Sequence, residues 1–231
     1  MMKLSVVIPV HNEQAGIKPV ALAVAETLAR EAVPYEILIV NDNSTDQTEA
    51  VLKELARDNA NIRYVNNHPP NGFGLAVRCG LRHFTGDAAA VYMGDGSDSP
   101  ADLVQFYRKV QEGYDCVFGT RWSQGGQVYD YPFFKRIFNR LANNFIRVIM
   151  QIGYDDVTNA FKMYRREVIH GVRPLLSRHY NLTVEMAIIR GYSYTVVPNS
   201  WTMGSRYLFI VLYCLLEKWL SHGDYHRSQR T

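Results

Sequence analysis

Short apolar runs alternate with segments of helical periodicity along the first half of the chain, and each apolar run ends in a polar loop. The runs Lys3–Val10, Tyr35–Val40 and Ile62–Val65 predict strands, and the segments between them carry apolar residues at helical spacing. Strands that alternate with helices in this way become parallel neighbours through right-handed crossovers. The sequence therefore predicts an α/β fold with a mostly parallel sheet flanked by helices. Its ligand site is expected at the carboxyl ends of the strands.

The loop after a fourth apolar run, Ala88–Met93, is the most informative of these loops. It carries Asp95 and Asp98 among glycines, and a helix is predicted to begin behind it at Pro100. Two carboxylates three residues apart at a strand end can meet one divalent cation, and hard oxygen ligands favour Mg²⁺ or Mn²⁺. The alternative is that both side chains only cap the turn and the helix.

Other strand ends carry further candidates. Asp42 follows the second strand, where it could hydrogen-bond a base or a ribose or simply form a turn. Arg121 follows a later predicted strand, where it could clamp a phosphate or form a surface salt bridge. The segment Asn71–Ala76 lacks the third glycine of a dinucleotide-binding fingerprint, so a tight turn is favoured there. Ser44 and Gln47 predict a capping box at the start of the second helix.

The second half of the chain is predicted to add two helices and two strands, at Phe133–Met150, Ala160–Tyr164, Asn181–Gly191 and Ser193–Val197. Arg136 and Asn139 lie one turn apart on the first of these helices and face the same way. The last segment, Tyr207–Leu220, is apolar nearly all round. It predicts a helix that is either buried or lies on a membrane, with a basic tail beyond it.

Composition narrows the possible classes of protein. The chain has 231 residues and a formal net charge of +3, too small to indicate nucleic-acid binding. Three widely spaced cysteines in apolar sequence predict reduced core residues of a cytosolic protein. The N-terminus enters a strand without a signal peptide, and the longest apolar run, Leu208–Leu216, is shorter than the roughly 20 residues of a spanning helix. These features predict a cytoplasmic protein that is soluble or peripheral on the cytoplasmic face of a membrane.

Eight short motifs along the chain resemble those of a known protein family. They are SVVIPVHNE (Ser5–Glu13), VNDNSTDQT (Val40–Thr48), NGFGLA (Asn71–Ala76), GDGSDSP (Gly94–Pro100), GTRW (Gly119–Trp122), KRIFN (Lys135–Asn139), DDVTNAFKMYR (Asp155–Arg165) and NLTVEM (Asn181–Met186). In this order they resemble family-2 glycosyltransferases of the GT-A fold, in the branch of dolichol-phosphate mannose synthases and other polyprenyl-phosphate glycosyltransferases. The resemblance covers nearly the whole chain. It implies a GT-A domain over residues 1–202 and a C-terminal amphipathic, membrane-interfacial helix and basic tail over residues 203–231.

The resemblance implies an inverting transfer from a nucleotide-sugar donor to a polyprenyl or dolichyl phosphate, with Mg²⁺ or Mn²⁺ as cofactor and a membrane surface as partner. GDP-mannose, UDP-glucose and UDP-GlcNAc stay open as donors, with mannose favoured. The residues implied for the nucleotide pocket are Pro9, His11, Glu13, Asp42 and Asp95, and those for the metal are Asp95 and Asp98. The residues implied for catalysis are Asp95, Asp98, Arg121 and Arg136, and those for the acceptor are Arg136, Asn139, Asp156 and Glu185.

The chain departs from the family pattern at two places. The usual Asp-x-Asp positions fall on Gly94 and Gly96, and Asp98 takes the position of a metal-contacting Gln, so Asp95 supplies the other carboxylate. Thr202 runs directly into Met203, without the family's Arg…Gly-x-Ser-Lys loop. Two alternatives remain open: a family-2 transferase that uses a sugar, polysaccharide or protein acceptor, and a non-catalytic nucleotide-sugar-binding protein.

Overall fold

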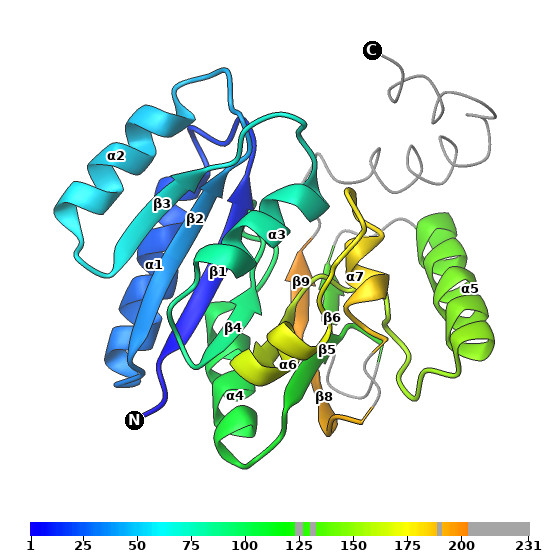
Figure 1. Cartoon of the computed structure of the whole chain (residues 1–231). Coiled ribbons are helices and arrows are strands. Elements are labelled where there is room, and N and C mark those ends of the chain that lie inside the picture. The colour runs from blue at the N-terminus through cyan, green and yellow to red at the C-terminus, as the bar shows by residue number, and fades with distance from the viewer. Residues whose placement is uncertain (123–126, 130–132, 189–190, 203–231) are drawn as a thin grey trace.

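The computed structural model of the chain describes residues 1–122, 127–129, 133–188 and 191–202 (Figure 1). For residues 127–129, 133–136, 201 and 202 it describes the backbone alone. The helix and tail predicted within residues 203–231 lie outside the described residues, and so does the side chain of Arg136.

Seven strands form the central sheet in the order β3–β2–β1–β4–β7–β5–β8. Their bounds are β1 Leu4–Val10, β2 Tyr35–Asn41, β3 Ile62–Asn66, β4 Ala88–Val91, β5 Cys116–Thr120, β7 Lys162–Arg165 and β8 Tyr194–Pro198. Neighbouring strands are parallel except at β7, which runs antiparallel between β4 and β5. The predicted mostly parallel sheet is therefore confirmed. A separate pair of parallel strands, β6 (Gln127–Tyr129) and β9 (Ser200–Thr202), was not predicted.

Helices cover both faces of the sheet. One apolar layer joins the sheet to α1 (Ile17–Arg30), α2 (Thr48–Asp58) and α4 (Pro100–Gln111). The other joins it to α3 (Phe73–His83), α6 (Arg166–Gly171) and α7 (Leu182–Glu185), which lie in front of the sheet in Figure 1. Since both faces are covered, a central strand is expected to be a nearly continuous apolar run. β1 is buried along its whole length, as its sequence predicts.

Helix α5 (Phe133–Met150) stands beside the sheet, at the right of Figure 1. The side chain of Asn143 on this helix is buried against the rest of the molecule. Five large apolar side chains are instead 58–71% exposed, namely Phe138, Leu141, Phe145, Val148 and Ile149. We call these five residues the outer apolar face of α5. Within the described ranges, no helix combines the length and hydropathy needed to cross a bilayer.

Two local predictions are wrong. Ser44 and Gln47 form no capping box, because the Asp46 carboxylate accepts the hydrogen bond from the Thr48 amide (2.9 Å) at the start of α2. The helix predicted over Asn181–Gly191 is shortened to α7. Its Thr183 carbonyl accepts a hydrogen bond from a buried lysine side chain, and the turn that follows tightens to i→i+3 hydrogen bonds.

Candidate active site

The polar loops singled out in the sequence lie at one edge of the sheet. β1, β2, β4 and β5 are parallel, so their carboxyl ends meet at that edge. β7 runs in the opposite direction, and its amino end therefore lies there too. The loop that precedes β7 joins the same edge, which we call the carboxyl edge.

Asp98 occupies an unusual environment in the turn after β4. Its side chain is only 4% exposed, and its Oδ2 accepts a hydrogen bond from the Met93 amide (3.0 Å). Its Oδ1 is also buried, and it has no hydrogen-bond partner among the described residues. Burial, assisted by the negative charge of Asp95, raises the pKa of Asp98 to about 7. The fold thus buries one carboxylate oxygen without a described hydrogen-bond partner, and we call it the open oxygen of Asp98.

The shape of this turn depends on its glycines. Gly96 has a φ of +74°, in the left-handed region that favours glycine. A Cβ at Gly94 would lie 2.7 Å from Val10 Cγ1 at the end of β1, so a larger residue there would require the Val10 side chain to move. Asp95 lies between them, and its Oδ1 accepts a hydrogen bond from the Ser97 amide (3.0 Å). Close packing at Gly94 and the left-handed backbone at Gly96 therefore favour glycine at these two positions, and Asp95 is left as the second carboxylate.

Asp95 and Asp98 fit a divalent cation that also binds substrate. A buried carboxylate oxygen without a partner is costly, and a cation would satisfy it. The described residues contain no group of three or more His, Cys, Asp or Glu that could hold a metal. Mg²⁺ commonly binds through one or two carboxylates and completes its coordination with waters and substrate phosphates. The two aspartates match that mode of binding.

His11 and Asp42 lie side by side at the ends of β1 and β2. The Asp42 carboxylate is held by Asn67 Nδ2 (2.7 Å) on Oδ1 and by the Gly72 amide (2.9 Å) on Oδ2. His11 Nδ1 lies 2.8 Å from the Asp42 carbonyl oxygen. The two predicted nucleotide-pocket residues are therefore fixed by neighbouring loops before any ligand binds.

Glu13 and Pro9 lie close to the turn that carries Asp95 and Asp98. The Glu13 amide donates to Thr48 Oγ1 (2.8 Å), which fixes the loop after β1. A Cβ at Gly16 would lie 3.2 Å from Glu13 Oε2 and 3.9 Å from the Gly94 carbonyl oxygen, so this loop and the turn are adjacent. Pro9 lies beyond the last β1–β4 residue pair, where its missing N–H removes no bond to β4.

A buried ion pair organises the other half of the carboxyl edge. Arg121 donates to Asp156 through Nε (2.8 Å) and Nη2 (2.7 Å), and its backbone amide donates to the same carboxylate (2.9 Å). Asp156 is fully buried and Arg121 is 9% exposed. Such bidentate pairs are strong and geometrically specific. Arg121, which was predicted to bind a phosphate, thus contacts Asp156, which was predicted to bind the acceptor.

A chain of hydrogen bonds continues from this pair to α5. Arg121 Nη2 donates to Thr158 Oγ1 (3.4 Å), and the Thr158 amide donates to Asn143 Oδ1 (3.0 Å). Asn143 Nδ2 in turn donates to Asn139 Oδ1 (2.9 Å). The structure therefore brings Arg121, Asn139 and Asp156 into one network.

Lys162, the first residue of β7, is a further polar residue of this half that the sequence did not single out. This side chain is buried, and its Nζ donates to the carbonyl oxygens of Val157 (2.8 Å) and Thr183 (2.5 Å). Burial lowers the pKa of Lys162 to about 7, even though the nearby Asp156 carboxylate acts in the opposite direction. Lys162 ties the loop before β7 to α7. The sequence feature that could have predicted it is a single lysine within an otherwise apolar strand pattern.

Glu185 holds a loop in place. Its carboxylate accepts hydrogen bonds from the amides of Leu176 (2.7 Å) and Ser177 (2.8 Å). The same loop packs on the start of α3, where a Cβ at Gly74 would lie 2.7 Å from the backbone carbon of Arg178. The glycine-rich start of α3 therefore makes room for this loop.

The sequence is similar to a protein family and to several proteins of known sequence. The family Glycosyl transferase family 2 matches residues 5–173. Polyprenol monophosphomannose synthase of Mycolicibacterium smegmatis is 30% identical over 209 residues, which cover 85% of this chain and 76% of that protein. Dolichol-phosphate mannosyltransferase of Pyrococcus furiosus is 28% identical over 207 residues, 89% of this chain and 57% of that protein. An uncharacterized glycosyltransferase of Synechocystis sp. is 28% identical over 177 residues, 77% of this chain and 54% of that protein. The chain thus spans just over half the length of the latter two relatives.

Solved structures share the fold. Glucosyl-3-phosphoglycerate synthase from Mycobacterium tuberculosis, in complex with Mn²⁺, UDP and phosphoglyceric acid, superposes with a TM-score of 0.65 at 17% identity, covering 87% of this chain and 69% of that one. The same enzyme in complex with Mg²⁺ and UDP gives a TM-score of 0.64 at 16% identity, covering 87% and 70%. These likenesses establish the GT-A fold that the sequence predicts.

Proposed function

The chain belongs to glycosyl transferase family 2, and on that premise we propose that it transfers a hexose, in preference mannose, from a nucleoside-diphosphate sugar to a polyprenyl or dolichyl phosphate. The observation that carries the proposal is the buried, open Oδ1 of Asp98 beside Asp95, next to the residues assigned to the nucleotide. The names of two relatives, a polyprenol monophosphomannose synthase and a dolichol-phosphate mannosyltransferase, support this choice of sugar and acceptor.

In this proposal the donor binds to the part of the carboxyl edge that is formed by the ends of β1, β2 and β4. Pro9, His11, Glu13 and Asp42 line the nucleotide pocket, and Asp95 and Asp98 hold Mg²⁺ or Mn²⁺. When bound, the cation neutralises the negative charge that develops on the leaving nucleoside diphosphate. The Met93 amide fixes the Asp98 carboxylate, so its open oxygen is already oriented before the donor binds.

The acceptor binds to the other part of the edge, which is formed by the end of β5, the loop before β7 and helix α5. A phosphate monoester is anionic at neutral pH, so its oxygen attacks the anomeric carbon without a strong general base. Attack opposite the leaving group inverts the configuration. Arg121 lines this half with its guanidinium held by Asp156, while Arg136 and Asn139 on α5 meet the acceptor phosphate. Asp156 and Glu185 shape this half by holding Arg121 and the loop before α7.

We further propose that the enzyme works at the cytoplasmic face of a membrane. The outer apolar face of α5 supports this, because five large apolar side chains on one exposed helix face typically mark an interaction surface. A helix with one apolar and one basic face is suited to lie in the membrane interface. A polyprenyl chain resides in that environment, so the acceptor and the enzyme would meet there.

The test is incubation of the protein with radiolabelled GDP-mannose, UDP-glucose or UDP-GlcNAc, together with polyprenyl phosphate and Mg²⁺ or Mn²⁺. We expect label that is extractable into organic solvent, with GDP-mannose the best donor and no transfer when EDTA is present. Label only on a water-soluble acceptor would contradict the lipid acceptor. Donor binding without any transfer would contradict the assignment of an enzyme.

A further inference from the structure

Lys162 at the start of β7 is a buried cation that takes no part in the proposed reaction. Its side chain is 2% exposed, and among the residues that the structure describes it forms no ion pair with a carboxylate. Its Nζ instead donates to the carbonyl oxygens of Val157 (2.8 Å) and Thr183 (2.5 Å). A buried ammonium without a carboxylate partner is costly, so these two hydrogen bonds define what Lys162 contributes to the fold.

The first carbonyl belongs to the loop that carries Asp156. Val157 is fully buried in a tight turn, which is closed by a hydrogen bond from the Asn159 amide to the Asp156 carbonyl oxygen (3.1 Å). Asp156 directly precedes Val157, and its carboxylate holds the Arg121 guanidinium. A shift of the Val157 carbonyl would therefore be passed to the carboxylate that orients Arg121.

The second carbonyl belongs to α7, which carries Glu185. The Ala187 amide donates to the Val184 carbonyl oxygen (3.0 Å), so it does not bind the Thr183 carbonyl as it would in a continuing helix. Lys162 Nζ supplies the donor instead. Glu185 lies two residues further along and holds the loop before α7. An unpaired buried carbonyl is costly, so a single ammonium fixes the backbone beside both carboxylates that are assigned to the acceptor.

We propose that Lys162 is a positioning residue for the acceptor: it holds together the backbone beside Asp156 and Glu185, and through Asp156 it sets the orientation of Arg121. The assignment of these three residues to the acceptor rests on the proposed function. Lys162 is itself buried, so it acts through these side chains and not on a substrate. The hydrogen bonds of its side chain go to the acceptor part of the edge alone, so its loss is expected to leave donor binding unchanged.

The test compares Lys162→Met, which removes the charge and the donors but keeps an unbranched side chain, with Tyr164→Phe as the matched control. Tyr164 lies two residues along β7, on the same face of the sheet, and its buried hydroxyl donates to the Met186 carbonyl oxygen (2.8 Å). The control therefore also leaves a buried carbonyl next to α7 unpaired. It removes no described hydrogen bond to the loop that carries Asp156.

The first measurement is amide hydrogen exchange followed by NMR, which needs no activity. The amides of Arg121 and Thr158 are both hydrogen-bonded to side chains of the acceptor part of the edge, so they report on the position of the loop. In Lys162→Met both amides should exchange about tenfold faster, because a loop without its anchor opens more often. In Tyr164→Phe they should exchange at the wild-type rate. Wild-type exchange in Lys162→Met, or the same acceleration in the control, overturns the proposal.

The second measurement is steady-state transfer from GDP-mannose to polyprenyl phosphate. Lys162→Met should lower kcat/KM for polyprenyl phosphate by roughly one to two orders of magnitude, since misplacement of a binding group by about 1 Å can cost a hundredfold. The KM for GDP-mannose should stay within about twofold of the wild-type value. Equal losses for donor and acceptor would show that Lys162 serves the fold as a whole, and would overturn the proposal.

Lys162→Gln takes the place of Lys162→Met if the methionine variant does not fold. Glutamine keeps N–H donors on a shorter side chain, so the same changes are expected with smaller size. A chain that transfers no sugar would refute the proposed function, and the exchange rates would still decide whether Lys162 fixes the loop.

Discussion

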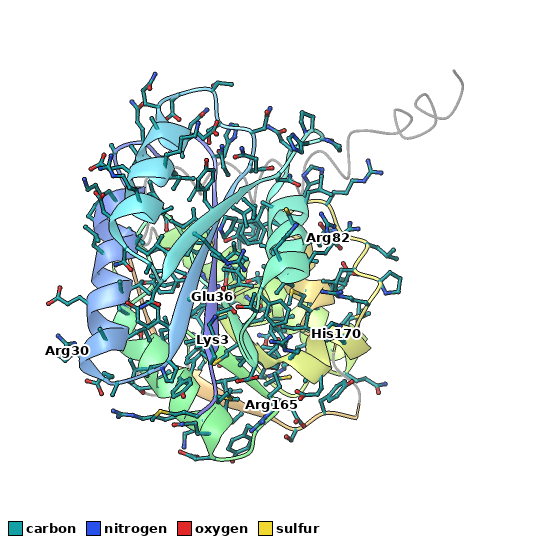
Figure 2. The ribbon with its side chains drawn as sticks, turned by 60° about the vertical axis from the view of Figure 1, so that its left-hand side comes forward. Lys3, Arg30, Glu36, Arg82, Arg165 and His170 are labelled. Atoms are coloured by element: carbon teal, nitrogen blue, oxygen red, sulfur yellow. The ribbon has the colours of Figure 1, made fainter. Side chains whose placement is uncertain are left out.

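Two buried carboxylates sit at opposite edges of the same sheet, in opposite surroundings. Glu36 is the second residue of β2, at the edge formed by the amino ends of the parallel strands (the amino edge), and it is 5% exposed. Asp98 at the carboxyl edge is 4% exposed. Both Glu36 oxygens are bound: Oε1 by Ser5 Oγ (2.5 Å) and the Thr85 amide (2.6 Å), and Oε2 by Arg63 Nε (2.9 Å). In Figure 2 Glu36 lies next to Lys3, a further positive charge. Asp98 keeps one oxygen open among the described residues.

The difference appears in the two pKa values. Burial alone would raise the pKa of Glu36, but hydrogen bonds from Arg63, Ser5 and Thr85 outweigh burial and lower it to about 2. At Asp98 burial prevails, and the pKa rises to about 7. A buried carboxylate whose oxygens are all bound stabilises the fold. One that is left open costs stability and is available to a ligand.

The largest effect is expected at the open carboxylate. Asp98→Asn keeps the shape of the side chain and an acceptor for the Met93 amide, but it removes the charge that would hold a cation. Sugar transfer should fall by roughly three to four orders of magnitude, as loss of metal-assisted charge stabilisation implies. Without metal, the free energy of unfolding should stay equal or rise, because a buried charge is gone. Turnover rates and urea unfolding measure both. Normal turnover, or a large loss of stability, would contradict the comparison.

The carboxyl edge also contains Asp156, a buried carboxylate that is bound by Arg121. It can therefore be compared with Asp98 at the same edge. Arg121→Gln leaves Asp156 buried with its charge uncompensated, so stability should fall by about 3–5 kcal/mol. Adding Asp156→Asn removes that charge and should recover much of the loss, which a double-mutant cycle in urea would measure. A single variant within about 0.5 kcal/mol of the wild type would show that the pair is not structural.

At the amino edge the expected loss concerns stability alone. Glu36→Gln should cost about 3 kcal/mol at pH 7, the scale of a pKa lowered from 4.5 to about 2. A lowered pKa gives stability that is fully present above the unfolded value and disappears as the pH falls through the folded value. The wild type and the variant should therefore converge between pH 4.5 and pH 2 in urea melts. Sugar transfer at pH 7, well below the melting temperature, should be unchanged; a loss of transfer there would show that the amino edge serves the chemistry.

The smallest effect is expected on the outer apolar face of α5. Phe145 is 67% exposed, so Phe145→Ser should change stability by no more than about 0.5 kcal/mol. Its loss should weaken binding to vesicles by about tenfold, since a buried phenylalanine contributes 1.5–3 kcal/mol at full burial and less at an interface. Co-sedimentation with phosphatidylcholine vesicles measures this. Leu22→Ser on α1, also an exposed apolar position, is the matched control and should bind like the wild type.

The sequence was sufficient where burial alone sets the pattern. β1 is covered on both faces, so its apolar run predicted both its existence and its parallel neighbours. Asp95 and Asp98 could be placed because they directly follow a strand. The Arg121–Asp156 contact could not, because it joins residues 35 positions apart and depends on the antiparallel direction of β7, which no local pattern indicates. Apolar periodicity indicates which face of a helix or strand is buried, but it does not indicate which charged side chains form ion pairs.

The antiparallel course of β7 has a practical consequence. The segment that enters it, Tyr154–Phe161, is anchored by Asp156 at one point and by Lys162 at its end, and it forms no part of the strands that carry the nucleotide residues. An engineer could therefore exchange this segment between relatives as a cassette. On the proposed function, such a graft is expected to change which molecule receives the sugar and to leave the donor preference of the host unchanged.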